Sequence, residues 1–190
     1  MVTIAPPPPA SGILSHGLPP GDRAPELDVP MAPDGRRALL ANYRDRPLVL
    51  IFYPGDFTPV CTGELGLFNE LLPDLQALGA SVLGISCDSL WSHCAYAREL
   101  NLRIPLLSDF HPKGALSRRY EVYRDDVGTS ERALFVVDGE GFLFWSEVSP
   151  IELNPGADGV LDALERLTGR EAAFAPVPPD APPPQPENQR

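Results

Sequence analysis

The clearest chemical signal in the sequence is Cys61, in the segment YPGDFTPVCTGEL that spans residues 53–65. An apolar run over residues 48–52 precedes it and predicts a buried strand, and a helical pattern follows it. Thr58 followed by Pro59 is a helix start signal, with the threonine hydroxyl as the expected cap. Cys61 then falls in the first turn, where free backbone N–H groups and the helix dipole favour a thiolate. The segment therefore predicts a cysteine nucleophile rather than an inert core cysteine.

The other residues with chemical potential form no second site. Cys87 and Cys94 make no C-x-x-C pair, so neither a zinc ribbon nor a thioredoxin-type dithiol is predicted. His93 and His111 are spaced for no metal site or triad, and we expect them on the surface or as satisfied core residues. No G-x-G-x-x-G or Walker sequence is present, so no bound cofactor or metal is predicted.

Composition limits the class of protein. A chain of 190 residues suits one soluble domain, and a net charge of -11 argues against nucleic-acid binding and against anionic membranes. The chain has three cysteines, and this odd number argues against the paired disulfide bonds that are typical of a small secreted domain. The first residues lack the pattern of a signal peptide, and no apolar run approaches the length of a membrane span. The expected compartment is the cytoplasm.

Proline content divides the chain into three parts. Residues 1–21 are expected to be a proline-rich N-terminal arm, and residues 170–190 a proline-rich flexible tail, because proline fixes φ and removes backbone donors. The folded domain is expected over residues 22–169.

Within that domain, strand patterns alternate with helix patterns. Pro73 is expected to kink or break the helix that follows Cys61, near Leu72, and Asp88 or Ser89 to cap the next helix. This order predicts an α/β fold with a mixed central sheet flanked by helices. Strands are expected at 24–29, 37–40, 48–52, 81–86, 105–107, 133–137 and 142–146, and helices at 58–78, 89–100, 115–120 and 159–167.

Three separated motifs resemble those of one family. Pro54, Thr58 and Cys61 form a P-xxx-T-xx-C signature, residues 105–123 read PLLSDFHPKGALSRRYEVY, and Arg132 lies in ERALFVVDGEG. In this order they resemble the peroxiredoxins (AhpC/TSA superfamily). The SDF-x-P-x-GA-x-S run, and a C-terminus without a resolving cysteine, look closest to the AhpE-like branch. The resemblance covers about residues 22 to 168 and implies a thioredoxin-like fold.

The resemblance implies a thiol-dependent peroxidase that reduces hydrogen peroxide and organic hydroperoxides through a cysteine sulfenic acid, in antioxidant defence. It assigns Cys61 as nucleophile, Thr58 to orient the peroxide, Arg132 to stabilise the thiolate and developing charge, and Pro54 to shield the sulfur. Non-catalytic roles stay open for three residues. Thr58 could serve only as a helix cap, Arg132 could be an exposed arginine at a strand end, and Glu64 could be a solvated carboxylate in the first helical turn. The two tryptophans, Trp91 and Trp145, are interpreted as packing residues.

The resemblance also implies partners, namely a homodimer and an external thiol reductant such as thioredoxin, a glutaredoxin-like protein or a low-molecular-weight thiol. The AhpE-like likeness favours a one-cysteine mechanism. Cys94 is nevertheless a candidate resolving cysteine, because the thiol peroxidase branch carries one in this helix, about one turn later. Cys87 is expected to be buried. A disulfide oxidoreductase, or a thioredoxin-fold redox sensor or binding module without turnover, remains the alternative function.

Overall fold

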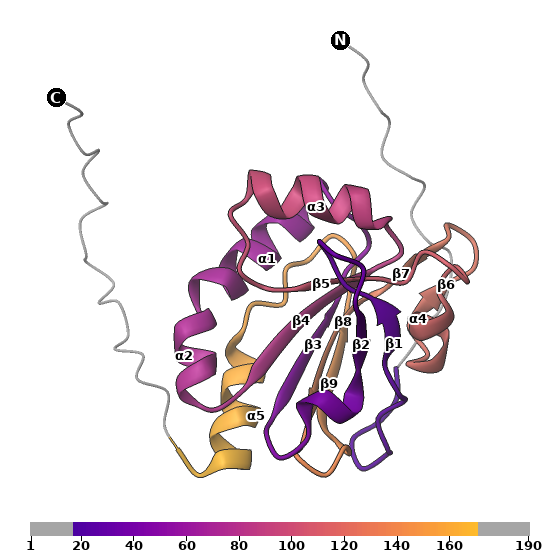
Figure 1. The fold of residues 1–190 in the computed structure, drawn as a ribbon. Coiled ribbons are helices and arrows are strands. Elements are labelled where there is room, and N and C mark those ends of the chain that lie inside the picture. Colours follow the sequence, from indigo (N-terminus) through magenta and orange to yellow (C-terminus); the bar gives the residue numbers. More distant parts are fainter. Residues whose placement is uncertain (1–16, 171–190) are drawn as a thin grey trace, which may run out of the picture.

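The computed structural model describes residues 17–170, which are built around one five-stranded mixed sheet that is covered on both faces (Figure 1). The strand order is β5-β4-β3-β8-β9. Strands β3, β4 and β5 run parallel, whereas β8 is antiparallel to β3 and β9 to β8. The mixed sheet expected of a thioredoxin-like fold is confirmed. The strands are β3 (Leu48–Phe52), β4 (Ser81–Ser86), β5 (Leu106–Ser108), β8 (Arg132–Val137) and β9 (Leu143–Ser149).

The two faces of the sheet carry two apolar clusters. In β3, Val49 and Ile51 point into the cluster under α1 (Pro59–Glu70), α2 (Leu72–Ala77), α3 (Leu90–Glu99) and α5 (Asp158–Thr168). Leu48, Leu50 and Phe52 alternate with them and pack under α4 (Ala115–Arg119) and the hairpin of β1 (Asp28–Pro30) and β2 (Arg37–Leu39). A strand buried on both faces reads as a continuous apolar run, as it does here.

The predicted elements are present within a few residues of their predicted bounds. The break expected at Pro73 is confirmed, because α1 ends at Glu70 and α2 begins at Leu72 with the proline in its first turn. Two elements were not predicted from the sequence, a short 3-10 helix (Leu40–Tyr43) and the hairpin of β6 (Tyr123–Arg124) and β7 (Thr129–Ser130). Strands of two residues are too short to show an alternating pattern.

The packing role predicted for Trp91 is wrong. Helix α3 turns His93 and Tyr96 toward the core, and Trp91 lies on the opposite side with 86% of its surface exposed. Trp145 is half-buried, packed against α5 at Gly159, as expected of a packing residue. The side of a helix that is buried depends on its docking, which its own sequence shows only weakly when its apolar residues are few.

The predicted arms, residues 1–21 and 170–190, lie mostly outside the described residues. The last residues of the first arm are described and contact the domain: Leu18 N donates to Tyr120 O at 3.2 Å, and Gly21 N to Leu143 O at 2.7 Å. Among residues 17–170, no helix is long and apolar enough to cross a membrane.

Candidate active site

Cys61 lies where strand β3 passes into helix α1, at the carboxyl end of a central strand. Thr58 occupies the N-cap position, Pro59 is the first helical residue, and Cys61 follows in the first turn, fully buried. Open α/β sheets place their sites at this edge. The predicted position of the cysteine is confirmed.

The hydroxyl of Thr58 does not cap the helix. It donates instead to the Gly55 carbonyl at 3.0 Å, so its lone pairs stay open to a donor outside the helix. The first helical bond runs from Thr62 N to Thr58 O at 2.9 Å. Within residues 17–170, no acceptor is recorded for the N–H groups of Val60 and Cys61. Two backbone donors therefore stand free beside the sulfur, as in the anion sites at helix N-termini.

Arg132 begins strand β8 and reaches the sulfur from the neighbouring strand. Its Nη2 lies 3.4 Å from Cys61 Sγ, and the side chain is only 1% exposed. The guanidinium is oriented by the Ile151 carbonyl, which accepts from Nε at 3.2 Å and from Nη2 at 2.9 Å. The alternative of an exposed strand-end arginine is wrong.

Glu64 is a buried residue of the site whose role was not predicted from the sequence. It is fully buried and its Oε2 accepts from Arg132 Nη1, so the solvated first-turn carboxylate is also wrong. Its Oε1 has no partner within the described chain. Burial raises the pKa of the Glu64 carboxyl to about 7, although Arg132 opposes this shift. Glu64 follows Cys61 by three residues and therefore lies on the same face of α1, and this spacing is the sequence feature that could have placed Glu64 in the site.

Glu64 gives a testable pH dependence of stability. Its carboxyl has a pKa of about 7 in the folded protein, compared with 4.5 for a carboxyl exposed to water. Between these two pH values the folded state therefore binds more protons than the unfolded state. The free energy of unfolding is therefore expected to fall as pH rises from about 4.5 to about 7, by on the order of 3 kcal/mol from this group. Urea titrations should show that Glu64→Gln removes this contribution. The matched control is Glu70→Gln, an exposed position of the same helix; equal pH slopes in both variants would contradict the assignment.

The site opens into a largely apolar cavity of about 630 Å³. Pro54, Thr58 and Arg132 all line it, and Arg132 also contacts the Cys61 sulfur. The hairpin β6–β7, which the sequence analysis missed, supplies one wall. The full lining comprises Pro54, Thr58, Pro59, Val60, Arg124, Val127, Thr129, Arg132, Ile151 and Glu152.

A buried polar network anchors the loop before Cys61. Tyr53 donates its hydroxyl to Asp56 Oδ1 at 2.8 Å, and His93 Nδ1 lies 3.0 Å from Asp56 Oδ2. The other nitrogen of His93 faces the Leu107 carbonyl at 3.1 Å, which requires an N–H there. His93 is therefore a buried residue with hydrogen-bond partners at both ring nitrogens, which is one of the two environments expected for it. It connects helix α3 to the loop that precedes Cys61.

The other cysteines lie away from this cavity. Cys94 lies on α3, half-buried, with Sγ 3.9 Å from the Pro33 carbonyl in a separate groove. Cys87 is buried as expected, and burial together with Asp109 raises the pKa of its thiol to about 11. All three cysteines are free thiols. Within residues 17–170, no cluster of three or more His, Cys, Asp or Glu side chains could hold a metal ion.

Comparison with known proteins identifies relatives over most of the chain. The sequence model described as the AhpC/TSA family matches residues 20–146. Peroxiredoxin 2 of Thermoplasma acidophilum is 31% identical over 153 residues, which cover 77% of this chain and 75% of that protein. Mouse peroxiredoxin-2 is 35% identical over 154 residues, covering 76% and 77%.

Comparison with solved structures also finds proteins with the same fold. The crystal structure of Enterococcus faecalis AhpC superimposes with a TM-score of 0.71 at 27% identity, covering 80% of this chain and 91% of that one. These matches do not distinguish the AhpE-like branch, which stays a prediction.

Proposed function

The chain belongs to the AhpC/TSA family of peroxiredoxins and is a thiol-dependent peroxidase, and we propose that Cys61 is the sulfur that reduces the peroxide. The observation that carries this proposal is the contact of 3.4 Å between Arg132 Nη2 and Cys61 Sγ in the first turn of α1. A buried cation and free helix N–H groups both favour a sulfur anion at this point.

In the proposed reaction, the Cys61 thiolate attacks one peroxide oxygen and the O–O bond breaks. The sulfur becomes a sulfenic acid, and the second oxygen leaves as hydroxide or alkoxide and takes a proton from water. Thr58 accepts from the peroxide O–H while it donates to Gly55. Arg132 and the free N–H groups stabilise the developing charge, and Pro54 shields the sulfur from water.

Both hydrogen peroxide and organic hydroperoxides are proposed as substrates. The cavity walls contributed by Val60, Val127 and Ile151 give an alkyl group an apolar surface. Repeated consumption of either peroxide by a catalytic amount of protein, with dithiothreitol as donor, tests the function. A redox sensor, the alternative, would oxidise once and stop.

Cys94 is proposed as the resolving thiol, with an external thiol as the final reductant. A disulfide needs the two Cα atoms within about 7 Å. Cys61 is fully buried at the start of α1, whereas Cys94 lies on α3 in a groove beside the Pro33 carbonyl, so local unwinding of α3 is part of the proposal.

Peptide mapping after one equivalent of peroxide is expected to recover a Cys61–Cys94 disulfide. Cys94→Ser should instead accumulate sulfenic acid on Cys61. If the variant turns over normally with dithiothreitol and with thioredoxin, and no such disulfide forms in the wild type, the mechanism uses one cysteine.

The domain boundaries at 22–169 lead to a separate prediction. Deleting residues 171–190 is expected to leave the melting temperature and the peroxide rate nearly unchanged, because a segment of that composition cannot bury a core. A melting temperature lower by many degrees would show that the tail docks on the domain.

A cytoplasmic homodimer completes the proposal. Free thiols persist in a reducing compartment, and the exposed aromatic side chains of Phe57 and Phe110 offer apolar contact surface. Sedimentation velocity tests the dimer.

A further inference from the structure

The cavity beside Cys61 is lined by two arginines, of which only one contacts the sulfur. Arg132 donates to Cys61, whereas Arg124 lies on strand β6, in the hairpin that walls the cavity. The Arg124 side chain is only 9% exposed. An arginine stays charged in a protein, so a guanidinium that is covered to this degree needs partners for its N–H donors. The surroundings of Arg124 therefore indicate what it is placed to bind.

Arg124 forms ion pairs, but no hydrogen bond from its side chain is recorded among residues 17–170. Its Nη2 lies 3.7 Å from Asp126 Oδ2 and its Nε 3.8 Å from Glu131 Oε1, and both distances are too long for hydrogen bonds. In the described part of the chain, the only enclosed side-chain nitrogen or oxygen without a partner is Glu64 Oε1. The guanidinium nitrogens of Arg124 are therefore not enclosed by protein and reach the open space of the cavity that this residue lines. They are donors available to a bound molecule.

The positive charge of Arg124 is already balanced by acidic neighbours. Glu131 is nearly buried, and burial raises the pKa of its carboxyl while Arg124 opposes the rise. Asp126 and Glu152 add to the rise in this pKa, because their negative charges lie near Glu131. Glu152 also lines the cavity. An anionic substrate would meet these three carboxylates beside one arginine, so their repulsion offsets its attraction.

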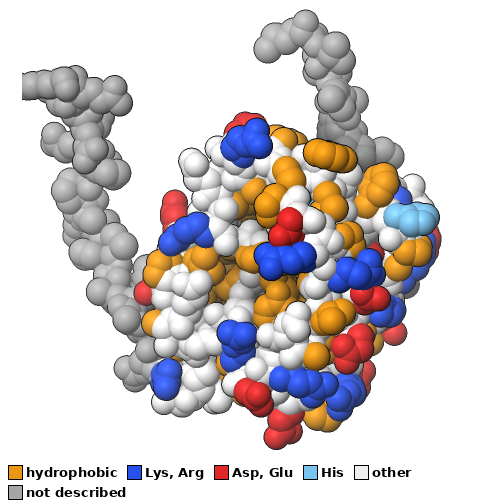
Figure 2. Space-filling model, viewed as in Figure 1, with side chains coloured by type: hydrophobic (Ala, Val, Ile, Leu, Met, Phe, Trp, Pro, Cys, Tyr) orange, Lys and Arg blue, Asp and Glu red, His pale blue; other side chains and the backbone are white. Residues whose placement is uncertain are grey.

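The charge of the whole chain also disfavours an anion. The formal net charge is -11, and the field of such a protein repels anionic small molecules as they approach. Figure 2 shows acidic and basic side chains interspersed over the drawn face, which therefore offers no broad basic area to gather anions. A hydrogen bond from Arg124 to an uncharged oxygen avoids both kinds of repulsion. The carbonyl oxygen of an ester or an amide is such an acceptor.

We propose that Arg124 is a specificity-determining residue whose guanidinium binds a neutral carbonyl oxygen on the organic part of a hydroperoxide. The preferred substrate class is then an ester or amide of a hydroperoxy acid, rather than the free acid or a plain alkyl hydroperoxide. The alkyl part of the substrate packs on Val127 and Ile151. This proposal rests on the peroxidase function proposed for Cys61, because it concerns which peroxides are accepted by the same cavity.

The first test compares three tertiary hydroperoxides on the wild-type protein. They share a short alkyl chain that ends in a methyl ester, a free carboxylate or a methyl group, and each is made in several chain lengths. Stopped-flow measurements give the second-order rate constant for oxidation of Cys61. At the best chain length the ester-ended compound is expected to react about tenfold faster than the methyl-ended one, the scale of one hydrogen bond to a charged group. The carboxylate-ended compound should react no faster than the methyl-ended one.

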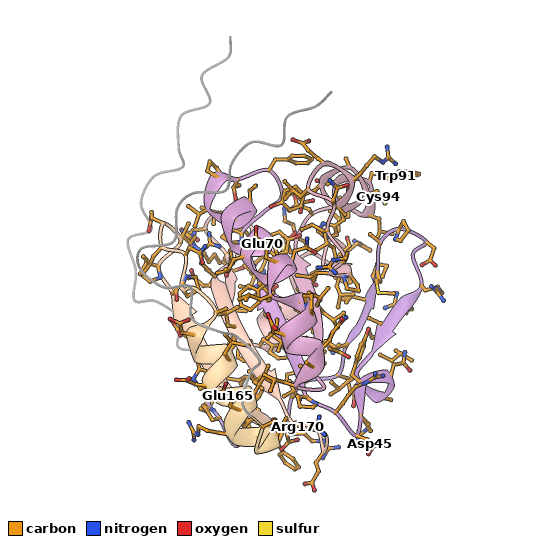
Figure 3. The ribbon with its side chains drawn as sticks, turned by 90° about the vertical axis from the view of Figure 1, so that its left-hand side faces the viewer. Asp45, Glu70, Trp91, Cys94, Glu165 and Arg170 are labelled. Atoms are coloured by element: carbon orange, nitrogen blue, oxygen red, sulfur yellow. The ribbon has the colours of Figure 1, made fainter. Side chains whose placement is uncertain are left out.

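The second test removes the donors of Arg124. In Arg124→Met, the ratio of the ester rate to the hydrogen peroxide rate is expected to fall about tenfold, because methionine fills much of the same volume but donates no hydrogen bond. The matched control is Arg170→Met, an exposed position that should keep the wild-type ratio. Figure 3 shows Arg170 at the opposite end of the molecule from Trp91 and Cys94, whose helix α3 contacts the active loop.

The third test concerns the acidic neighbours. Glu131→Gln removes one carboxylate beside Arg124 and keeps the shape of the side chain. Because less negative charge then opposes an anion, the rate of the carboxylate-ended compound should rise several-fold relative to that of the ester-ended one. An unchanged ratio would overturn the preference for neutral over anionic substrates.

The wild-type comparison keeps the proposal falsifiable without any variant that has to fold. Equal rates for the ester-ended and methyl-ended compounds at every chain length would refute it, as would a carboxylate-ended compound that reacts fastest. An ester preference that persists in Arg124→Met, or an equal fall in Arg170→Met, would also remove Arg124 from substrate recognition. Absence of any reaction with hydrogen peroxide would instead refute the peroxidase function proposed for Cys61, so the two failures are distinguishable.

Discussion

Replacing Cys61 by serine is expected to abolish peroxide reduction. A serine hydroxyl is almost entirely protonated near neutral pH, so it gives no anionic nucleophile to attack the peroxide oxygen. The surroundings that favour an anion, Arg132 at 3.4 Å and the start of α1, cannot make up for that difference. Stopped-flow measurement of peroxide loss, with the protein in excess, should give a rate no greater than that of buffer.

The matched control is Cys87→Ser. This cysteine is also buried, but burial raises the pKa of its thiol to about 11 and it lines neither of the two cavities described. It should keep the wild-type rate. More than a trace of activity in folded Cys61→Ser protein would mean that another residue attacks the peroxide.

Replacing Arg132 by methionine should slow the oxidation of Cys61 by on the order of 10²-fold or more, the loss seen when a preorganised electrostatic stabiliser is removed. Methionine fills much of the same volume but carries no charge and donates no hydrogen bond. It therefore removes both the contact to Cys61 and the pair with Glu64. The second-order rate constant with hydrogen peroxide measures the effect.

Two further variants separate chemistry from folding. Arg119→Met changes an exposed arginine of α4 and should leave the rate unchanged. The double variant Arg132→Met with Glu64→Gln avoids a buried carboxylate without its cation, so it should regain stability but not rate. A folded Arg132→Met protein that reacts at the wild-type rate would remove Arg132 from the proposed mechanism.

Much of the fold follows from local sequence. The continuous apolar runs at 48–52 and 81–86 specify strands buried on both faces, and Pro73 separates α1 from α2 because proline is tolerated in the first turn of a helix but not in its interior. The position of Cys61 is local in the same sense, because Pro59 occupies the first position of α1 and Cys61 follows two residues later. Spacing along one chain segment was sufficient for these predictions.

What only the tertiary structure decided is which distant groups meet. Arg132 lies 68 residues from Glu64, and their buried pairing requires β8 to lie beside β3. The pairing of His93 with Asp56, and the exposure of Trp91, depend in the same way on how α3 docks against the active loop. A side chain's hydrogen-bonding capacity can be read from its type, but its partner and its burial are set by the packing of elements far apart in sequence. The family motif predicted Cys61 and the Arg132 cation beside it, but the buried Glu64 that pairs with this cation appeared only in the tertiary structure.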